Sequence, residues 1–131
     1  KQAKKAASEL DSNIKVLAVT ILTSISQNEL SKMGANNLVE DMVIKLAKNS
    51  NEADGYIASP LEVKALREKI SKDKLIFCPG VRMPGDKKDD QARISTPALA
   101  FKNGADAVIM GRSLMKNIED NLSQISKSLK R

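Results

Sequence analysis

The sequence predicts an α/β fold in which helices flank a parallel sheet. Short apolar runs recur four times along the 131 residues, and each is followed by a stretch with helical spacing or a helix-start signal. Strands and helices that alternate in this way pair in parallel through right-handed crossovers. The composition agrees, because 41% of the residues are hydrophobic and only 2% are aromatic, which indicates an aliphatic core.

The first part of the chain contains the clearest strand. Residues 2–10 are rich in Ala and Lys and predict a helix. The apolar run at 14–22 is typical of a strand that is covered on both faces of a parallel sheet. Ser26 and Glu29 form a capping-box pattern that starts a short helix, and Gly34 ends it. Apolar residues then recur at helical spacing at Leu38, Val39, Met42, Val43 and Leu46.

The second part of the chain repeats the order of strand and helix three times. Apolar runs at 54–58, 75–78 and 107–110 are expected to be strands. A helix is expected at 97–102, after a Ser-Thr-Pro start and before a glycine. The last helix has apolar residues spaced by four, three and four, at Ile118, Leu122, Ile125 and Leu129.

The strongest helix-start signal follows the second predicted strand. Ser59 as N-cap, Pro60 at the first helical position and Glu62 at the third predict a helix that begins immediately after Ser59. We therefore interpret Ser59 as a capping residue. Asp54 and Asp106 precede strands, so we expect them at the amino-terminal edge of the sheet, with a structural role.

Two segments that follow neighbouring strands carry residues suited to bind an anion. Arg82 follows the third predicted strand, and Gly111 and Arg112 follow the fourth, at a helix start. Parallel strands end at one edge of a sheet, so these residues would converge there on a phosphate site. Gln91 lies in the polar loop between the segments. The alternative is an ordinary turn with a surface arginine, and a solvated Gln91.

Composition narrows the classes of function. The net charge is +6, but only Tyr56, Phe77 and Phe101 are aromatic, so we expect no nucleic-acid partner. No apolar run approaches the ~20 residues of a membrane span, and no signal peptide is visible. The single Cys78 has no partner for an internal disulfide, which indicates a cytoplasmic setting. With no His to activate it, Cys78 is interpreted as a packed apolar residue.

Four βα units leave two closures open. One is a small doubly wound sheet, and the other is half of a (β/α)₈ barrel, since a whole barrel needs roughly 250 residues. In either case we expect residues 1–131 to form one domain. The chain begins with Lys1 rather than Met, which is typical of a fragment or a processed chain.

Several segments match one known family in order and spacing. They lie at 17–24, 54–60, 79–82 with 90–91, 96–97, and 104–106 with 111–112. In these segments the chain resembles bacterial orotidine 5′-phosphate decarboxylase. That family is a (β/α)₈ barrel, usually a homodimer, and the resemblance implies that this chain is its carboxyl-terminal (βα)₄ half.

The resemblance also implies a reaction and a set of binding residues. The family removes CO₂ from orotidine 5′-phosphate to give UMP in pyrimidine synthesis, with no metal or organic cofactor. It implies that Thr23 contacts the pyrimidine end of the nucleotide, and that Arg82, Gln91, Gly111 and Arg112 bind the ligand, chiefly at its phosphate. A Thr at position 23 is equally suited to a turn or a helix cap.

The family's catalytic motif, Asp-x-Lys-x-x-Asp, is not expected in this half. Residues 86–91 resemble it in part, but they end in Gln and lie in a loop, so we interpret the match as coincidence. We assign no catalytic residue and expect the chain alone to be inactive. Arg93, Lys87 and Lys88 are interpreted as solvated. Met83 replaces a proline common in the family, which predicts a looser start to this loop.

Three interpretations of function remain open at this point. In the first, the chain needs a complementary amino-terminal half to complete the enzyme. In the second, it is an inactive half-barrel that self-associates or binds nucleotides, because four strands leave unpaired edges and an apolar face. In the third, it belongs to a related sugar-phosphate lyase, although Thr23 and the Asp90-Gln91 pair favour the nucleotide enzyme.

Overall fold

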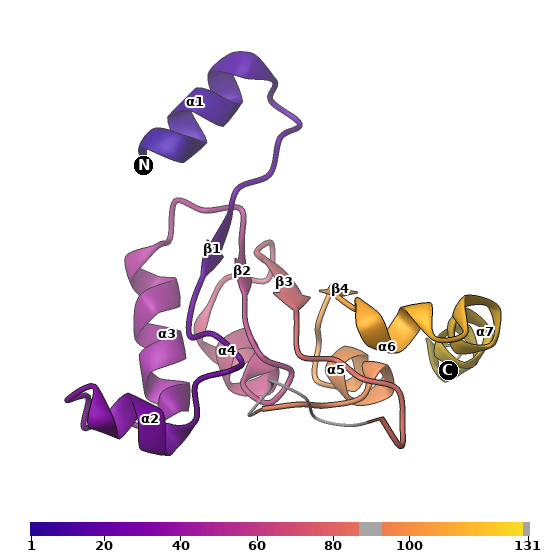
Figure 1. The fold of residues 1–131 in the computed structure, drawn as a ribbon. Coiled ribbons are helices and arrows are strands. Elements are labelled where there is room, and N and C mark those ends of the chain that lie inside the picture. The colour runs from indigo at the N-terminus through magenta and orange to yellow at the C-terminus, as the bar shows by residue number, and fades with distance from the viewer. Residues whose placement is uncertain (87–92, 130–131) are drawn as a thin grey trace.

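The computed structural model describes residues 1–86 and 93–129, which contain a four-stranded parallel sheet (Figure 1). Its strands follow one another along the chain in the order β1 (Leu17–Val19), β2 (Gly55–Ile57), β3 (Leu75–Cys78) and β4 (Ala107–Val108). Each strand pairs in parallel with the next. This order is that of a barrel segment, whereas a doubly wound sheet reverses its strand order. The structure therefore selects the half-barrel.

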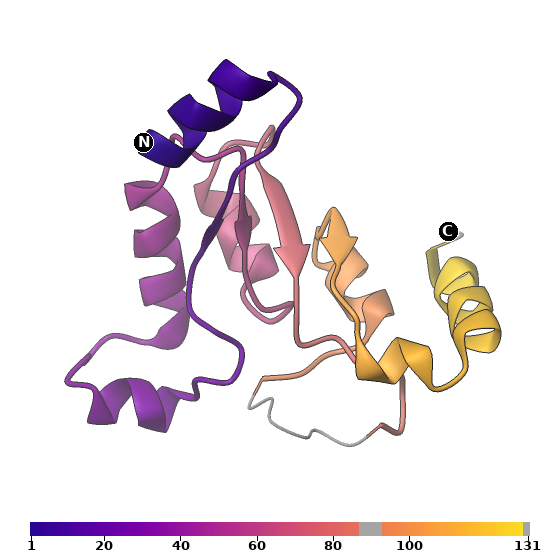
Figure 2. The same cartoon turned by 45° about the horizontal axis from the view of Figure 1, so that its top comes forward.

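The helices lie mainly on one face of this sheet. Figure 2 shows the strands in front of α4 and α5, and in both views α1 lies beyond the amino-terminal ends of the strands (Figures 1 and 2). None of the helices in the described ranges is long and apolar enough to span a membrane. They are α1 (Gln2–Leu10), α2 (Gln27–Lys32), α3 (Val39–Asn49), α4 (Val63–Lys69), α5 (Pro97–Lys102), α6 (Arg112–Met115) and α7 (Ile118–Leu129).

The core lies between the sheet and helices α3 to α5. Tyr56, Ile76 and Cys78 point from β2 and β3 into this layer and are at most 2% exposed. They join Val43 of α3 and Leu66 of α4 in one apolar cluster. Full burial of an aliphatic side chain of this size contributes about 1.5–3 kcal/mol, so this layer holds the half-barrel together.

The opposite face of the sheet is apolar, and the described residues leave it largely uncovered. Side chains alternate along a strand, so Val19, Ile57 and Phe77, which are in register, point away from the helices. Val19 remains 56% exposed, and Ile109 beyond β4 remains 47% exposed. In a complete (β/α)₈ barrel this face would point toward the barrel axis.

The amino-terminal edge of the sheet is held by two carboxylates, as expected from their positions. Asp54 accepts hydrogen bonds from Lys4 Nζ at 2.6 Å and from the Val16 amide at 2.8 Å. Asp106 accepts from the Ile76 amide at 2.7 Å. The hydrogen bond from Lys4, followed by that from Val16, holds the pKa of Asp54 below its ordinary value. Both residues are structural.

Most elements lie where the sequence predicts them; β3 has the predicted bounds, and the other three strands are shorter. The Ser26 and Glu29 capping box starts α2, and Thr96 caps α5. The strand predicted at 14–22 covers only Leu17–Val19. It begins late because the Val16 amide is bonded to a side chain instead of a neighbouring strand. It ends early because its partner β2 ends at Ile57.

The helix start predicted after Ser59 is wrong. Helix α4 begins at Val63, with Glu62 at the N-cap position. Ser59 is fully buried, and its hydroxyl accepts from the Leu61 amide at 3.3 Å in a turn that precedes the helix. Glu62 does not complete a capping box, because its carboxylate is bonded to Arg93. The three residues that looked like a first helical turn are thus a separate turn.

Candidate phosphate-binding site

The candidate site lies at the carboxyl-terminal edge of the sheet. Thr23 follows β1, Arg82 follows β3, and Gly111 and Arg112 follow β4. Because the strands are parallel, the segments that carry these four residues leave the sheet at the same edge, and Figure 2 shows the segments after the strands on one side. The structure therefore brings together every predicted site residue that it describes. Gln91 lies outside the described residues.

A buried hydroxyl joins the turn after β3 to the turn after β4. Ser113 of α6 is 2% exposed, and its Oγ accepts from the Met83 amide at 2.8 Å. The same hydroxyl donates to the carboxylate of Asp86. Lys116 Nζ donates to the other oxygen of Asp86 at 2.6 Å. The segment that begins the loop is thus fixed against α6, whose first residue is Arg112.

The expectation that Met83 loosens the loop start is wrong. Met83 is 8% exposed, and its amide makes the hydrogen bond to Ser113 that a proline has no N–H to make. The hydrogen bond from Lys116, followed by that from Ser113, lowers the pKa of Asp86. Asp86 is therefore ionised at neutral pH and remains paired with Lys116.

Arg82 is buried but keeps donor capacity. Its side chain is 8% exposed, and Nη1 donates to the Val81 carbonyl at 3.1 Å. Among the described residues, no acceptor meets its Nε. Its backbone is rigid, because its amide donates to the Ser95 carbonyl at 2.9 Å. A guanidinium has five N–H donors and no acceptor, so a ligand that supplies anionic oxygens suits this position.

Gly111 and Arg112 form the turn that starts α6. The amides of Leu114 and Met115 donate to the Gly111 carbonyl at 3.0 and 3.2 Å, which closes this turn. A Cβ placed on Gly111 would meet no atom of the described chain within 4 Å. Packing inside the protein therefore gives no reason for glycine here, whereas close approach of a ligand to the backbone does. Arg112 is exposed beside it.

Thr23 is held against the turn that follows β3. Its side chain is 6% exposed, and its carbonyl accepts from the Arg93 amide at 3.1 Å. Gly80 has a φ of 71°, and a Cβ there would lie 2.9 Å from the Arg93 carbonyl oxygen and 3.2 Å from the Thr23 Cβ. Only glycine fits between the two residues. Thr23 therefore lies beside the segment that carries Arg82.

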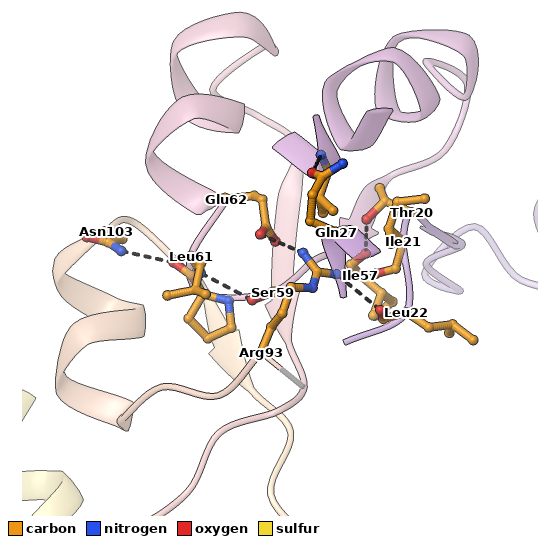
Figure 3. Close-up of polar contacts among 12 residues, drawn as sticks. Thr20, Ile21, Leu22, Gln27, Ile57, Ser59, Leu61, Glu62, Arg93 and Asn103 are labelled. Atoms are coloured by element: carbon orange, nitrogen blue, oxygen red, sulfur yellow. Dashed lines mark hydrogen bonds and ion pairs between the residues drawn. The ribbon is translucent and has the colours of Figure 1, made fainter. Parts of the chain in front are cut away.

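The interpretation of Arg93 as a solvated loop residue is wrong. Arg93 is 9% exposed, and its Nη1 donates to Glu62 Oε1 at 2.6 Å (Figure 3). Its Nη2 donates to the carbonyls of Ile21 and Leu22 at 3.2 and 3.1 Å. Burial raises the pKa of Glu62, and the charge of Arg93 opposes this effect. Glu62 and Arg93 are 31 residues apart, so no local pattern reveals the pair.

Cys78 is packed in the core, as predicted. Its side chain is fully buried, and burial, followed by the charge of Glu62, raises the pKa of its thiol to about 12. A protonated, inaccessible thiol is a poor nucleophile. Lys87 and Lys88, and with them most of the 86–91 match to the catalytic motif, lie outside the described residues.

Comparison with known proteins identifies the family. The family model described as "Orotidine 5'-phosphate decarboxylase / HUMPS family" matches residues 1–124. The chain belongs to this family. It is 49% identical over 104 residues to orotidine 5'-phosphate decarboxylase from Trichlorobacter lovleyi, covering 78% of this chain and 43% of that protein. It is 44% identical over 113 residues to the enzyme of the same name from Lactobacillus johnsonii, covering 83% and 48%.

Solved structures agree with the half-barrel. The crystal structure of orotidine 5'-phosphate decarboxylase from Lactobacillus acidophilus matches with a TM-score of 0.67 at 35% identity, covering 89% of this chain and 50% of that one. An uncharacterized conserved protein from Geobacillus kaustophilus shares the fold, with a TM-score of 0.68 at 20% identity. This decarboxylase-family chain thus spans about half the length of the relatives it matches.

Proposed function

We propose that this chain is the carboxyl-terminal part of an orotidine 5′-phosphate decarboxylase and supplies its grip on the nucleotide phosphate. The observation that carries the proposal is the hydrogen bond from the Met83 amide to Ser113. It fixes the segment of Arg82 against the turn of Gly111 and Arg112. The family membership supports the same assignment.

Each residue has a distinct part in binding. Arg82 and Arg112 supply guanidinium donors to the phosphate, and Gly111 lets the backbone approach it. Thr23 supplies a hydroxyl to the pyrimidine end, and Gln91 adds a further contact from the loop. Binding energy from a remote phosphate stabilises the transition state at the reacting ring when the two are rigidly connected.

The decarboxylation itself is assigned to residues outside this chain. The lysine and aspartate side chains of the family motif belong, in our proposal, to an amino-terminal half that covers the apolar face of the sheet. Val19 and Ile109 on that face would then become buried. The reaction is proposed to need no metal or organic cofactor and to take place in the cytoplasm. This chain alone binds UMP and turns over no substrate.

Titration of the isotope-labelled chain with UMP tests this proposal. We expect the amide resonances of Arg82, Gly111 and Arg112 to shift, and the Arg112→Ala variant to lose most of the binding. Lys69→Ala removes one positive charge from the far end of α4 and serves as the matched control. Amide resonances around Gly111 whose chemical shifts do not change when UMP is added would contradict the proposal.

The uncovered sheet face favours a second candidate function. An apolar face of this kind, with two unpaired edges, is typical of an interaction surface. In this candidate function the chain is an inactive module in which two copies cover this face for each other. Light scattering with and without an amino-terminal half separates the cases. A stable homodimer that excludes the other half supports the module, and a complex of the two halves supports the enzyme.

A further inference from the structure

We propose that Arg93, paired with Glu62, is a positioning residue that holds Thr23 in place for the pyrimidine end of the nucleotide. The inference rests on the proposed function. Arg93 is not one of the proposed ligand-binding residues. The inference makes it responsible for a preference for a nucleotide over a sugar phosphate without a base.

Arg93 makes its described hydrogen bonds with Glu62 and with the turn that carries Thr23. The guanidinium of Arg93 lies between the carboxylate of Glu62 and the carbonyls of Ile21 and Leu22 (Figure 3). The backbone amide of Arg93 donates to the next carbonyl, that of Thr23, at 3.1 Å. One residue therefore bonds to three consecutive carbonyls of the turn that carries Thr23.

The turn that carries Thr23 lies beyond the strand pairing of β1. β1 ends at Val19, so the carbonyls of Ile21 and Leu22 lie beyond the last strand pairing. The Leu22 carbonyl also accepts from the Ile25 amide at 2.9 Å, and Nη2 of Arg93 reaches both carbonyls from a fixed plane, where an ammonium would supply a point charge. Glu62 fixes the orientation of that plane from the start of α4.

The ion pair of Glu62 and Arg93 is a weak source of folding stability, because it leaves buried polar atoms without partners among the described residues. Glu62 Oε2 and Arg93 Nε are both buried without an acceptor or donor among the described residues. Buried ion pairs often stabilise a fold no better than apolar residues of similar volume would. The pair is incompletely bonded, yet its guanidinium makes two directed contacts to the turn whose next carbonyl accepts from the Arg93 amide, so it is better explained by the position it gives to Thr23.

Arg67, at the other edge of the sheet, makes contacts of the same kind as Arg93. Arg67 donates to the carbonyls of Gly104 and Lys74 at 2.8 and 2.6 Å and pairs with Asp106. Its contacts have the same chemistry as those of Arg93, two carbonyls and one carboxylate. It lies at the amino-terminal ends of β3 and β4, away from the candidate site. Arg67→Gln is therefore a control for the general cost of losing such an arginine.

The experiment compares affinities for UMP and for ribose 5-phosphate, measured by titration of the isotope-labelled chain. We expect the unaltered chain to prefer UMP. Arg93→Gln is expected to reduce that preference by about threefold to tenfold, the range for one lost hydrogen bond, with the affinity for ribose 5-phosphate unchanged. Arg93→Lys keeps the charge without the fork and should fall between the two. Arg67→Gln should leave the preference unchanged.

Each other outcome overturns a defined part of the account. An Arg93→Gln chain that prefers UMP as strongly as Arg67→Gln overturns the inference and leaves the proposed function intact. An unaltered chain that binds neither ligand overturns both. Glu62→Gln, which keeps the shape of the side chain, replaces Arg93→Gln if that variant does not fold. Failure of both to fold where Arg67→Gln folds shows a purely structural pair and overturns the inference.

Discussion

Single hydroxyl and amide groups decide how the candidate site is held together. Ser113 accepts from the Met83 amide and donates to Asp86, so both of its hydrogen-bonding directions are used in a buried place. A residue that looks like an ordinary small side chain in the sequence thus joins two loops. The sequence indicates Gly111 and Arg112 but contains no signal for Ser113, because its partners are about 30 residues away.

Replacement of Ser113 tests this junction. We expect Ser113→Ala to lower the free energy of unfolding by about 1–3 kcal/mol, because it leaves the buried Met83 amide without an acceptor. Urea unfolding followed by circular dichroism measures the change. Ser128→Ala is the control, since the Ser128 hydroxyl donates to the Ile125 carbonyl of its own helix. Equal unfolding midpoints for the two variants would contradict this role of Ser113.

The Cys78 thiol provides a second test at the scale of the residue. Its raised pKa of about 12 means that little thiolate exists at pH values near neutrality, and its side chain is fully buried. We expect a disulfide reagent to modify the native chain very slowly and the urea-unfolded chain rapidly. Similar rates in the two states would show that Cys78 is accessible, against the packing described for β3.

At the scale of the element, local patterns succeed where local contacts decide. The capping box at Ser26 and the N-cap at Thr96 are found from the sequence because both partners of each contact lie within one turn. The same reasoning fails at Ser59, because Glu62 is bonded to distant Arg93 instead of its own turn. The ends of β1 are missed for a similar reason, since they depend on Asp54 and on the length of β2.

Thr96 offers a test of one such local contact. Its hydroxyl accepts from the Leu99 amide at 3.3 Å at the start of α5. We expect Thr96→Ala to destabilise the chain by about 1 kcal/mol, the usual cost of a lost N-cap, and to lower the thermal midpoint. Ser123, exposed within α7, provides a control in which Ser→Ala removes no cap. A thermal midpoint unchanged by Thr96→Ala would argue against the cap.

The amino-terminal edge predicts a dependence on pH. The lowered pKa of Asp54 means that its ionised form stabilises the folded chain. This stabilisation is complete above the ordinary value of 3.8 and is lost as the pH falls through the lower folded value. We therefore expect Asp54→Asn to be less stable than the unaltered chain at neutral pH, with the difference vanishing as the pH falls below the lowered pKa of the folded chain. A difference that persists at low pH would contradict this.

At the scale of the whole molecule, the sequence predicts four βα units but not how they close. The strand order β1-β2-β3-β4 decides this, because it runs along the sheet without the reversal of a doubly wound fold. The candidate residues after β1, β3 and β4 are predicted correctly to share that edge. What the sequence does not predict is the buried framework behind them, because Glu62, Arg93 and Ser113 act through contacts between distant segments.

The half-barrel leaves one apolar face of its sheet exposed. A sheet with one covered and one uncovered apolar face buries only part of the surface that a full barrel buries. The exposure of Val19 and Ile109 follows from this uncovered face and not from either residue alone. The proposed division of labour follows, with phosphate binding in this chain and the reacting groups in its complement.

Mixing this chain with an amino-terminal half of the Trichlorobacter lovleyi relative tests that division most directly. Release of CO₂ from orotidine 5′-phosphate is measured for each half and for the mixture. We predict no release by either half, and release by an equimolar complex whose KM rises when Arg112 is replaced by Ala. Release by this chain alone, or a stable complex without activity, would contradict the account.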